Sequence, residues 1–264
     1  MLGVFFVLPF AGIIAASFFH RVDGGFYTPA FELDNYGRLF DAFFTRVLGF
    51  SLWIAALGAA LTLAIGFPFT YALTLLKREA QVPWLVLVLA VLSLSEVIIG
   101  FAWSSLLSRT AGLSNLLVMA GLLDTAQAWY PGFPALLIGL VYLGLPYSVL
   151  ALYPAVSRLD RDVLDAAHTL GATPMRAFLR ITLPLLRIPL LVTFIMLFVI
   201  DLGCYLLPQI LGKPEHWTLS VLITDQALFQ ANVPFAAALA VALLATTAGL
   251  VALVSAIGRR GMAP

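Results

Sequence analysis

The fold of this chain is decided by a polar stretch, Asp165-Ala166-Ala167-His168-Thr169-Leu170-Gly171, which is followed ten residues later by Ile181-Thr182-Leu183-Pro184. Several arginines lie around this stretch, whereas the longer segments on either side are almost entirely apolar. A short polar element between two long apolar segments needs a reason to be there. We expect it to fold outside the membrane and to bind a partner in the cytoplasm.

The composition indicates a membrane protein. Of the 264 residues, 62% are hydrophobic and 10% are charged, against about 45–50% and 25% in an average soluble domain. Several runs approach or exceed the roughly 20 apolar residues that cross a bilayer core about 30 Å thick. We therefore predict an all-α polytopic membrane protein, with residues 1–264 forming a single transmembrane domain.

Six transmembrane helices are predicted from the apolar runs. The first apolar run could be mistaken for a signal peptide, but it lacks a basic segment and a cleavage site, so we interpret it as a retained span. The sequence enters this run abruptly, which suggests a longer native N-terminal tail. The predicted spans are residues 2–19, 47–76, 84–107, 134–156, 185–210 and 233–257.

The positive-inside rule orients these spans. With a cytoplasmic N-terminus, nine basic residues lie inside and five lie outside, which also places the C-terminus and the 157–184 loop in the cytoplasm. The inner residues are Lys77, Arg78, Arg158, Arg161, Arg176, Arg180, Arg187, Arg259 and Arg260, and the outer ones are Arg21, Arg38, Arg46, Arg109 and Lys213.

The cytoplasmic loop is predicted to form two short helices at an angle. Asp160 is placed to cap the first helix, because its side chain accepts hydrogen bonds from free backbone N–H groups. Gly171 allows the turn that ends this helix. Thr173-Pro174 starts the second helix, with threonine as the N-cap and proline at the first helical position. Phe178 is expected to face the membrane, while Arg176 stays in water.

This segment resembles the EAA loop of permease subunits from binding-protein-dependent ABC importers. That loop has the pattern Glu-Ala-Ala, three residues, Gly, nine residues, Ile-x-Leu-Pro. Asp165-Ala166-Ala167, Gly171, Ile181 and Leu183-Pro184 match it with every spacing kept, except that aspartate replaces glutamate. The resemblance implies a coupling helix–turn–helix whose contacts to a partner ATPase are made by Asp165, Ala166, Ala167, Gly171, Ala172 and Arg176.

Other segments resemble the spermidine/putrescine branch of this family. They are Asn35-Tyr36, Gly66-Phe67-Pro68-Phe69-Thr70-Tyr71-Ala72, Phe101-Ala102-Trp103, Gly112-Leu113-Ser114-Asn115 and Leu207-Pro208-Gln209-Ile210-Leu211-Gly212. In that family two permease subunits form a pore in the bacterial inner membrane, an ATPase dimer binds the coupling loops, and an extracytoplasmic solute-binding protein delivers the solute. The resemblance implies these partners and surrounding lipid, with no nucleic acid, with ATP on the ATPase, and with no cofactor or metal in this chain.

Two carboxylates fall inside predicted spans, Glu96 in the third and Asp201 in the fifth. A carboxylate at the centre of a span costs about 2.5–3.5 kcal/mol on insertion scales, so a lipid-facing position is disfavoured. Both residues either line a polar translocation pathway or are buried in structural pairs or hydrogen bonds to neighbouring helices. Trp103 and Tyr205 are further candidates for the pathway.

Enzyme chemistry has no supporting motif in the sequence. There is no His-Glu-x-x-His pair, no Gly-x-Ser-x-Gly elbow and no phosphate-binding Gly-x-x-x-x-Gly-Lys loop. An importer would therefore need a separate ATPase. The alternative is an ion-gradient-driven secondary transporter in which Glu96 and Asp201 relay protons or cations, but it leaves the 157–184 loop without a role.

The cargo is less well defined than the mechanism. The resemblance favours a polyamine or another small polar solute, and carboxylates within the membrane suit a cation. Cys204 and Gly100 depart from the branch, whose members often carry glutamate and arginine there. Related branches move ferric iron, thiamine or phosphonates, and the sequence leaves a homodimer and a heterodimer open.

Overall fold

A computed structural model describes residues 2–22, 27–110, 112–159, 169 and 171–260. These residues are almost entirely helical, and their one β-bridge joins His20 to Thr28 without forming a sheet. The longer helices are α1 (Leu2–Ala16), α3 (Ala42–Leu75), α4 (Arg78–Leu92), α5 (Glu96–Leu106), α7 (Phe133–Val156), α11 (Arg187–Gly203) and α14 (Val233–Arg260). The shorter elements are α2 (Asp34–Arg38), α6 (Leu113–Met119), α9 (Pro174–Ala177), η1 (Phe178–Thr182), α10 (Leu183–Leu185), α12 (Leu206–Leu211), η2 (Pro214–His216), α13 (Leu219–Thr224) and η3 (Asp225–Phe229).

Three described helices are long and apolar enough to cross a membrane by themselves, namely α3, α7 and the Val233–Ala252 part of α14. Two further candidates are helix pairs with a sharp bend. The α4–α5 pair bends by 97°, and the Phe178–Leu185 segment bends by 66° relative to α11. By length and composition the described residues therefore hold three to five spans, and the apolar part of α1, Val7–Ala16, is shorter.

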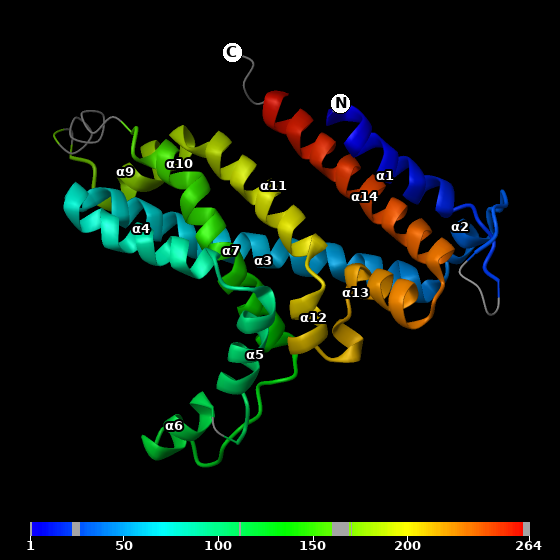
Figure 1. Ribbon diagram of the computed structural model, residues 1–264. Coiled ribbons are helices and arrows are strands. Elements are labelled where there is room, and N and C mark those ends of the chain that lie inside the picture. The colour runs from blue at the N-terminus through cyan, green and yellow to red at the C-terminus, as the bar shows by residue number, and fades with distance from the viewer. Residues whose placement is uncertain (1, 23–26, 111, 160–168, 170, 261–264) are drawn as a thin grey trace.

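Helices α3, α7 and α11 pack together at the centre of the molecule (Figure 1). The sequence predicts that Gly58, Gly66, Gly100 and Gly139 permit close helix contacts, and this prediction is confirmed. A Cβ atom at Gly58 would lie 2.5 Å from Asp201 Oδ2, and one at Gly66 would lie 2.9 Å from Ser148 Cβ. Small residues let helix backbones approach closely, as is usual between membrane helices.

The third predicted span, residues 84–107, is broken rather than continuous. The break lies at residues 93–95, where two serines satisfy backbone groups locally. Ser93 Oγ donates to the Ala90 carbonyl (2.7 Å), and Ser95 Oγ accepts from the N–H of Val97 (3.3 Å) as the N-cap of α5. Serine side chains compete with the helical pattern in this way, so one helix ends and another starts.

The fifth predicted span, residues 185–210, is broken near its C-terminal end. Helix α11 ends at Gly203, Cys204 is extended (φ −66°, ψ 126°), and α12 begins at Leu206. Pro208 stands in the first turn of α12, where its missing N–H has no intrahelical partner to lose. The two halves of this span therefore run in different directions (Figure 1).

The terminal helices α1 and α14 lie side by side, with the start of α1 near the end of α14 (Figure 1). The segment that follows α1 folds back so that α2 contacts the residues directly after α1. Asn35 Nδ2 donates to the carbonyl oxygens of Ser17 and Phe19 (3.2 Å each). Arg38 lies 4.0 Å from the ring centroid of Phe235 in α14. Helix α6 lies in the connection between the third and fourth predicted spans.

Candidate translocation and coupling sites

The two helix breaks meet in space. Helix α5 packs against α12, and Gly100 allows this contact, because a Cβ atom there would lie 3.0 Å from Ile210 Cδ1. Glu96 stands at the start of α5 and Cys204 between α11 and α12. The Cys204 thiol donates to Glu96 Oε2 across the junction, with a sulfur–oxygen distance of 3.7 Å.

Glu96 lines a cavity of about 210 Å³ between α4, α5 and α7. Tyr142 and Tyr147 of α7 form part of its wall, and the other lining residues are Val91, Leu92, Leu94, Ile99, Leu143 and Pro146. The sequence prediction missed both tyrosines. Their position near the middle of an apolar span was the available signal, because tyrosine in spans is enriched at the two membrane interfaces instead.

Trp103 does not line this cavity but contacts Tyr142, which does. Its ring meets that of Tyr142 edge to face, with 5.6 Å between the centroids. Tyr205 stands at the second break and is partly exposed, but it does not line the Glu96 cavity. The structure therefore brings Trp103 close to Glu96 through Tyr142, and it places Tyr205 apart from this cavity.

Asp201 is separated from the Glu96 cavity and lies in the contact between α11 and α3. Its side chain is only 2% exposed, and neither carboxylate oxygen has a hydrogen-bond partner in the described part of the chain. Gly58 makes room for it. An ionised carboxylate without a partner at such a site is costly, which sets Asp201 apart from the cavity-lining Glu96.

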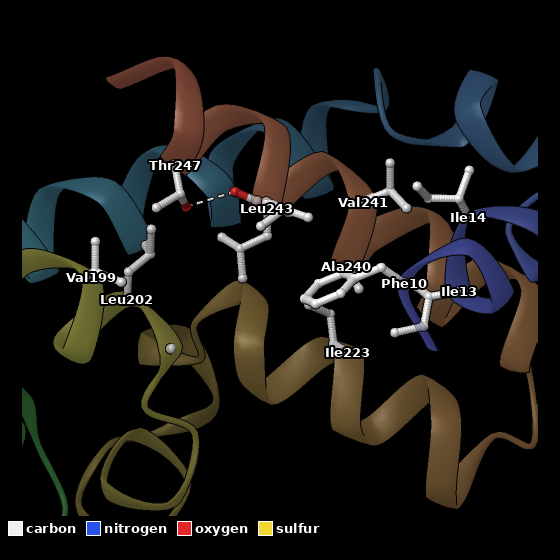
Figure 2. A pocket seen from close by; sticks show the side chains of 12 residues that line it. Phe10, Ile13, Ile14, Val199, Leu202, Ile223, Ala240, Val241, Leu243 and Thr247 are labelled. Carbon is white, nitrogen blue, oxygen red and sulfur yellow. Dashed lines mark hydrogen bonds between the residues drawn. The ribbon is translucent and has the colours of Figure 1, made fainter. Parts of the chain in front are cut away.

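Two other cavities have more apolar walls than the Glu96 cavity. One of about 220 Å³ lies directly beside it and shares Val91, Tyr142 and Pro146 as walls, but is otherwise lined by apolar residues of α3, α4 and α7. The other, of about 300 Å³, lies between α1, α11, α13 and α14 (Figure 2). Its only side-chain hydroxyl, that of Thr247, donates to the Leu243 carbonyl at 2.7 Å (Figure 2).

Part of the predicted coupling loop lies outside the described residues, including Asp165, Ala166 and Ala167. The described part agrees with the predicted turn chemistry. Gly171 has φ +84°, a left-handed conformation that favours glycine. Thr173 Oγ1 accepts from the N–H of Arg176 (3.4 Å), and α9 begins at Pro174. Ala172 is half-buried, and Arg176 is exposed, as the sequence predicts for that arginine.

An aromatic contact joins this loop to the central helices. The ring of Phe178, the first residue of η1, stacks on Phe67 of α3 at 5.3 Å and meets Tyr71 edge to face at the same distance. Phe67 in turn packs in a cluster with Leu152 of α7 and with Leu186, which precedes α11. Through Phe67, the Phe178 ring is therefore connected to α3, to α7 and to the residue that precedes α11.

Metal chemistry finds no support in the part of the chain that the structure describes. Within it, no group of three histidine, cysteine, aspartate or glutamate side chains could hold an ion. Cys204 is the one cysteine of the sequence and lies buried.

Residues 4–260 match the family described as the inner membrane component of binding-protein-dependent transport systems. The chain belongs to this family. It is thus an inner-membrane permease subunit of an ABC importer, as the sequence resemblance implied.

Curated relatives of the permease include the spermidine/putrescine transport system permease protein PotB of Escherichia coli K12. The two sequences are 31% identical over 240 residues, which cover 91% of this chain and 87% of the relative. PotB of Haemophilus influenzae is 28% identical over 94% of this chain and 87% of its own length.

Solved structures show that the permease shares the fold of ABC transporters. A bacterial transporter involved in import of the acidic polysaccharide alginate matches with a TM-score of 0.71 and 22% identity, over 98% of this chain and 91% of that one. A bacterial alginate transporter in complex with its pentasaccharide-bound periplasmic protein matches with a TM-score of 0.75 and 19% identity, over 97% and 89%. At these identities the likeness concerns the fold alone.

Proposed function

We propose that the permease forms half of the translocation pathway for a polyamine-type cation and is driven by a separate ATPase dimer. The relationship to PotB supports the cargo, since 31% identity extends over 91% of the chain. The observation that carries the proposal is the Glu96 cavity, in which a carboxylate and two tyrosines meet at the junction of two broken helices.

The chemistry of this cavity suits an ammonium group. Glu96 supplies a negative charge in a low-dielectric region, where an ion pair is stronger than in water. The rings of Tyr142 and Tyr147 add a cation–π attraction of about 0.5–2 kcal/mol. The adjoining apolar cavity suits the methylene segments that separate the charges of a polyamine. Broken helices place such groups at membrane depth without exposing them to lipid.

Uptake measurements test the cargo. In a strain of the source bacterium that lacks this gene, uptake of radiolabelled putrescine and spermidine is expected to be lost and to return with the wild-type gene. Glu96→Gln should lower uptake at least about tenfold, a loss of roughly 1.4 kcal/mol, because the amide carries no charge. Glu79→Gln, on the exposed first turn of α4, is the matched control and should behave as wild type.

Two outcomes would contradict this proposal. If the deletion strain took up both polyamines normally, the cargo would be of another class. If uptake followed an imposed ion gradient and continued after ATP depletion, the secondary-transporter alternative would replace the ABC mechanism.

We further propose that six spans, both termini in the cytoplasm, and the EAA-type loop complete the arrangement. Asp165 would anchor to the ATPase, Gly171 would set the angle between the two short helices, and Arg176 would lie at the edge of the docking surface. The ring contact of Phe178 with Phe67 supports the transmission of movement from this loop to α3.

A further inference from the structure

Cys204 is held in place from two sides. Its backbone N–H donates to the carbonyl oxygens of Ile200 (3.0 Å) and Asp201 (3.3 Å), which fixes the end of α11. Its side chain is 4% exposed and packs among Ile99, Leu207 and other apolar residues of the α5–α7–α12 cluster. The position of the thiol is therefore set by the helix break.

The thiol engages only one of the two oxygens of Glu96. Oε2 accepts from Cys204, and among the residues that the structure describes the Glu96 side chain has no other hydrogen-bond partner. Glu96 is half-buried and lines its cavity, so Oε1 is free to meet a solute. A glutamate side chain with no contact would sample several rotamers, and ordering it on binding would cost affinity.

We propose that Cys204 is a positioning residue for transport: its thiol holds the Glu96 carboxylate toward the cavity so that the cation meets a preorganised anion. This inference rests on the proposed function of Glu96. A thiol suits the task because it is a weak, uncharged donor that leaves the negative charge of the carboxylate intact. A lysine or arginine in its place would neutralise that charge and compete with the cation.

Substitutions at residue 204 separate this role from simple packing. Cys204→Ser keeps a donor but is more polar, whereas Cys204→Val removes the donor and suits the apolar cluster. The proposal expects Cys204→Val and Cys204→Ala to lower spermidine uptake roughly 3- to 10-fold, the range for one lost hydrogen bond, and Cys204→Ser to restore most of it. A packing role expects the reverse order, with valine near wild type and serine most impaired, and that order would overturn the proposal.

The experiment uses the complete transporter, with radiolabelled spermidine as the probe. The amount of permease in the membrane and the basal ATP hydrolysis of the purified complex show that each variant folds and assembles. Ser104→Ala serves as the control, because Ser104 Oγ donates to the Phe101 carbonyl within α5 and not to Glu96.

A double substitution links Cys204 to Glu96. In the Glu96→Gln background, Cys204→Val should lower spermidine uptake by less than about a further twofold. The reason is that the effects of two substitutions do not add when one residue acts through the other. Full additivity of the two losses would overturn the inference while leaving the role of Glu96 intact. If Glu96→Gln itself did not change uptake, the proposed function of the Glu96 cavity would be wrong. This outcome differs from additive losses, so failure of the proposed function can be distinguished from failure of the Cys204 inference.

Discussion

At the scale of single residues, Gly66 decides how closely α3 approaches α7. A Cβ atom at this position would lie 2.9 Å from Ser148 Cβ and even closer to its hydroxyl. Ser148 is fully buried, and its Cβ cannot move away without the backbone of α7. An added methyl group would therefore push the two helices apart along their main contact.

Gly66→Ala is expected to destabilise the permease by about 1–3 kcal/mol, the usual cost of overpacking a close contact. Its melting temperature in detergent, followed by fluorescence-detected size exclusion, should fall below that of wild type. Gly49→Ala provides the control on the same helix, because a Cβ atom there meets nothing within 4 Å. Equal melting temperatures for the two variants would show that this contact is not limiting for stability.

The buried Asp201 and the cavity-lining Glu96 also differ at this scale. The sequence treats them alike, as two acidic residues inside apolar runs. Asp201 is enclosed by α3 and α11, and its oxygens have no hydrogen-bond partner in the described ranges. Glu96 has a donor and a cavity beside it. Only the packing of neighbouring helices separates the two roles.

At the scale of elements, η1 links the coupling loop to the central helices. It is a π-helical turn, Phe178–Thr182, and its first ring packs against Phe67 and Tyr71 of α3. A helix that moves as a unit transmits displacement through such packed contacts. We therefore expect the contact of Phe178 to couple ATP hydrolysis to transport.

Phe178→Ala should lower solute uptake about fivefold while ATP hydrolysis by the complex changes little, because aromatic pairs contribute about 0.5–1.5 kcal/mol beyond their buried area. The measurement is the number of solute molecules taken up per ATP hydrolysed in proteoliposomes. Leu179→Ala, the next residue along and exposed, is the matched control. If uptake and hydrolysis fell in proportion, Phe178 would act on assembly and not on coupling.

At the scale of the whole molecule, charge and shape predict the same orientation. The nine basic residues assigned to the cytoplasm include those near the coupling loop and at the end of α14, and the other five are assigned to the opposite side. In Figure 1 the start of α1 and the end of α14 lie on the side of the molecule that carries α9 and α10, away from α6. These observations support cytoplasmic termini and an outer α6.

Cysteine labelling tests this orientation. A membrane-impermeant maleimide added to cells with a permeabilised outer membrane should label Lys213→Cys, whereas Lys77→Cys should react only after the inner membrane is opened. Both lysines are exposed, and the native Cys204 is buried and gives a low background. The opposite labelling pattern would invert the predicted topology.

The sequence by itself determined the family, the helical membrane class and the turn chemistry around Gly171 and Thr173, because these depend on local composition and spacing. It also identified Glu96 as a residue that needs an explanation. The meeting of the two helix breaks in space, the pairing of Glu96 with Cys204 and the placing of the two tyrosines in the same cavity were decided by tertiary structure alone. The physical reason is that apolar periodicity records which residues avoid water, but it does not record which helices face one another within the membrane.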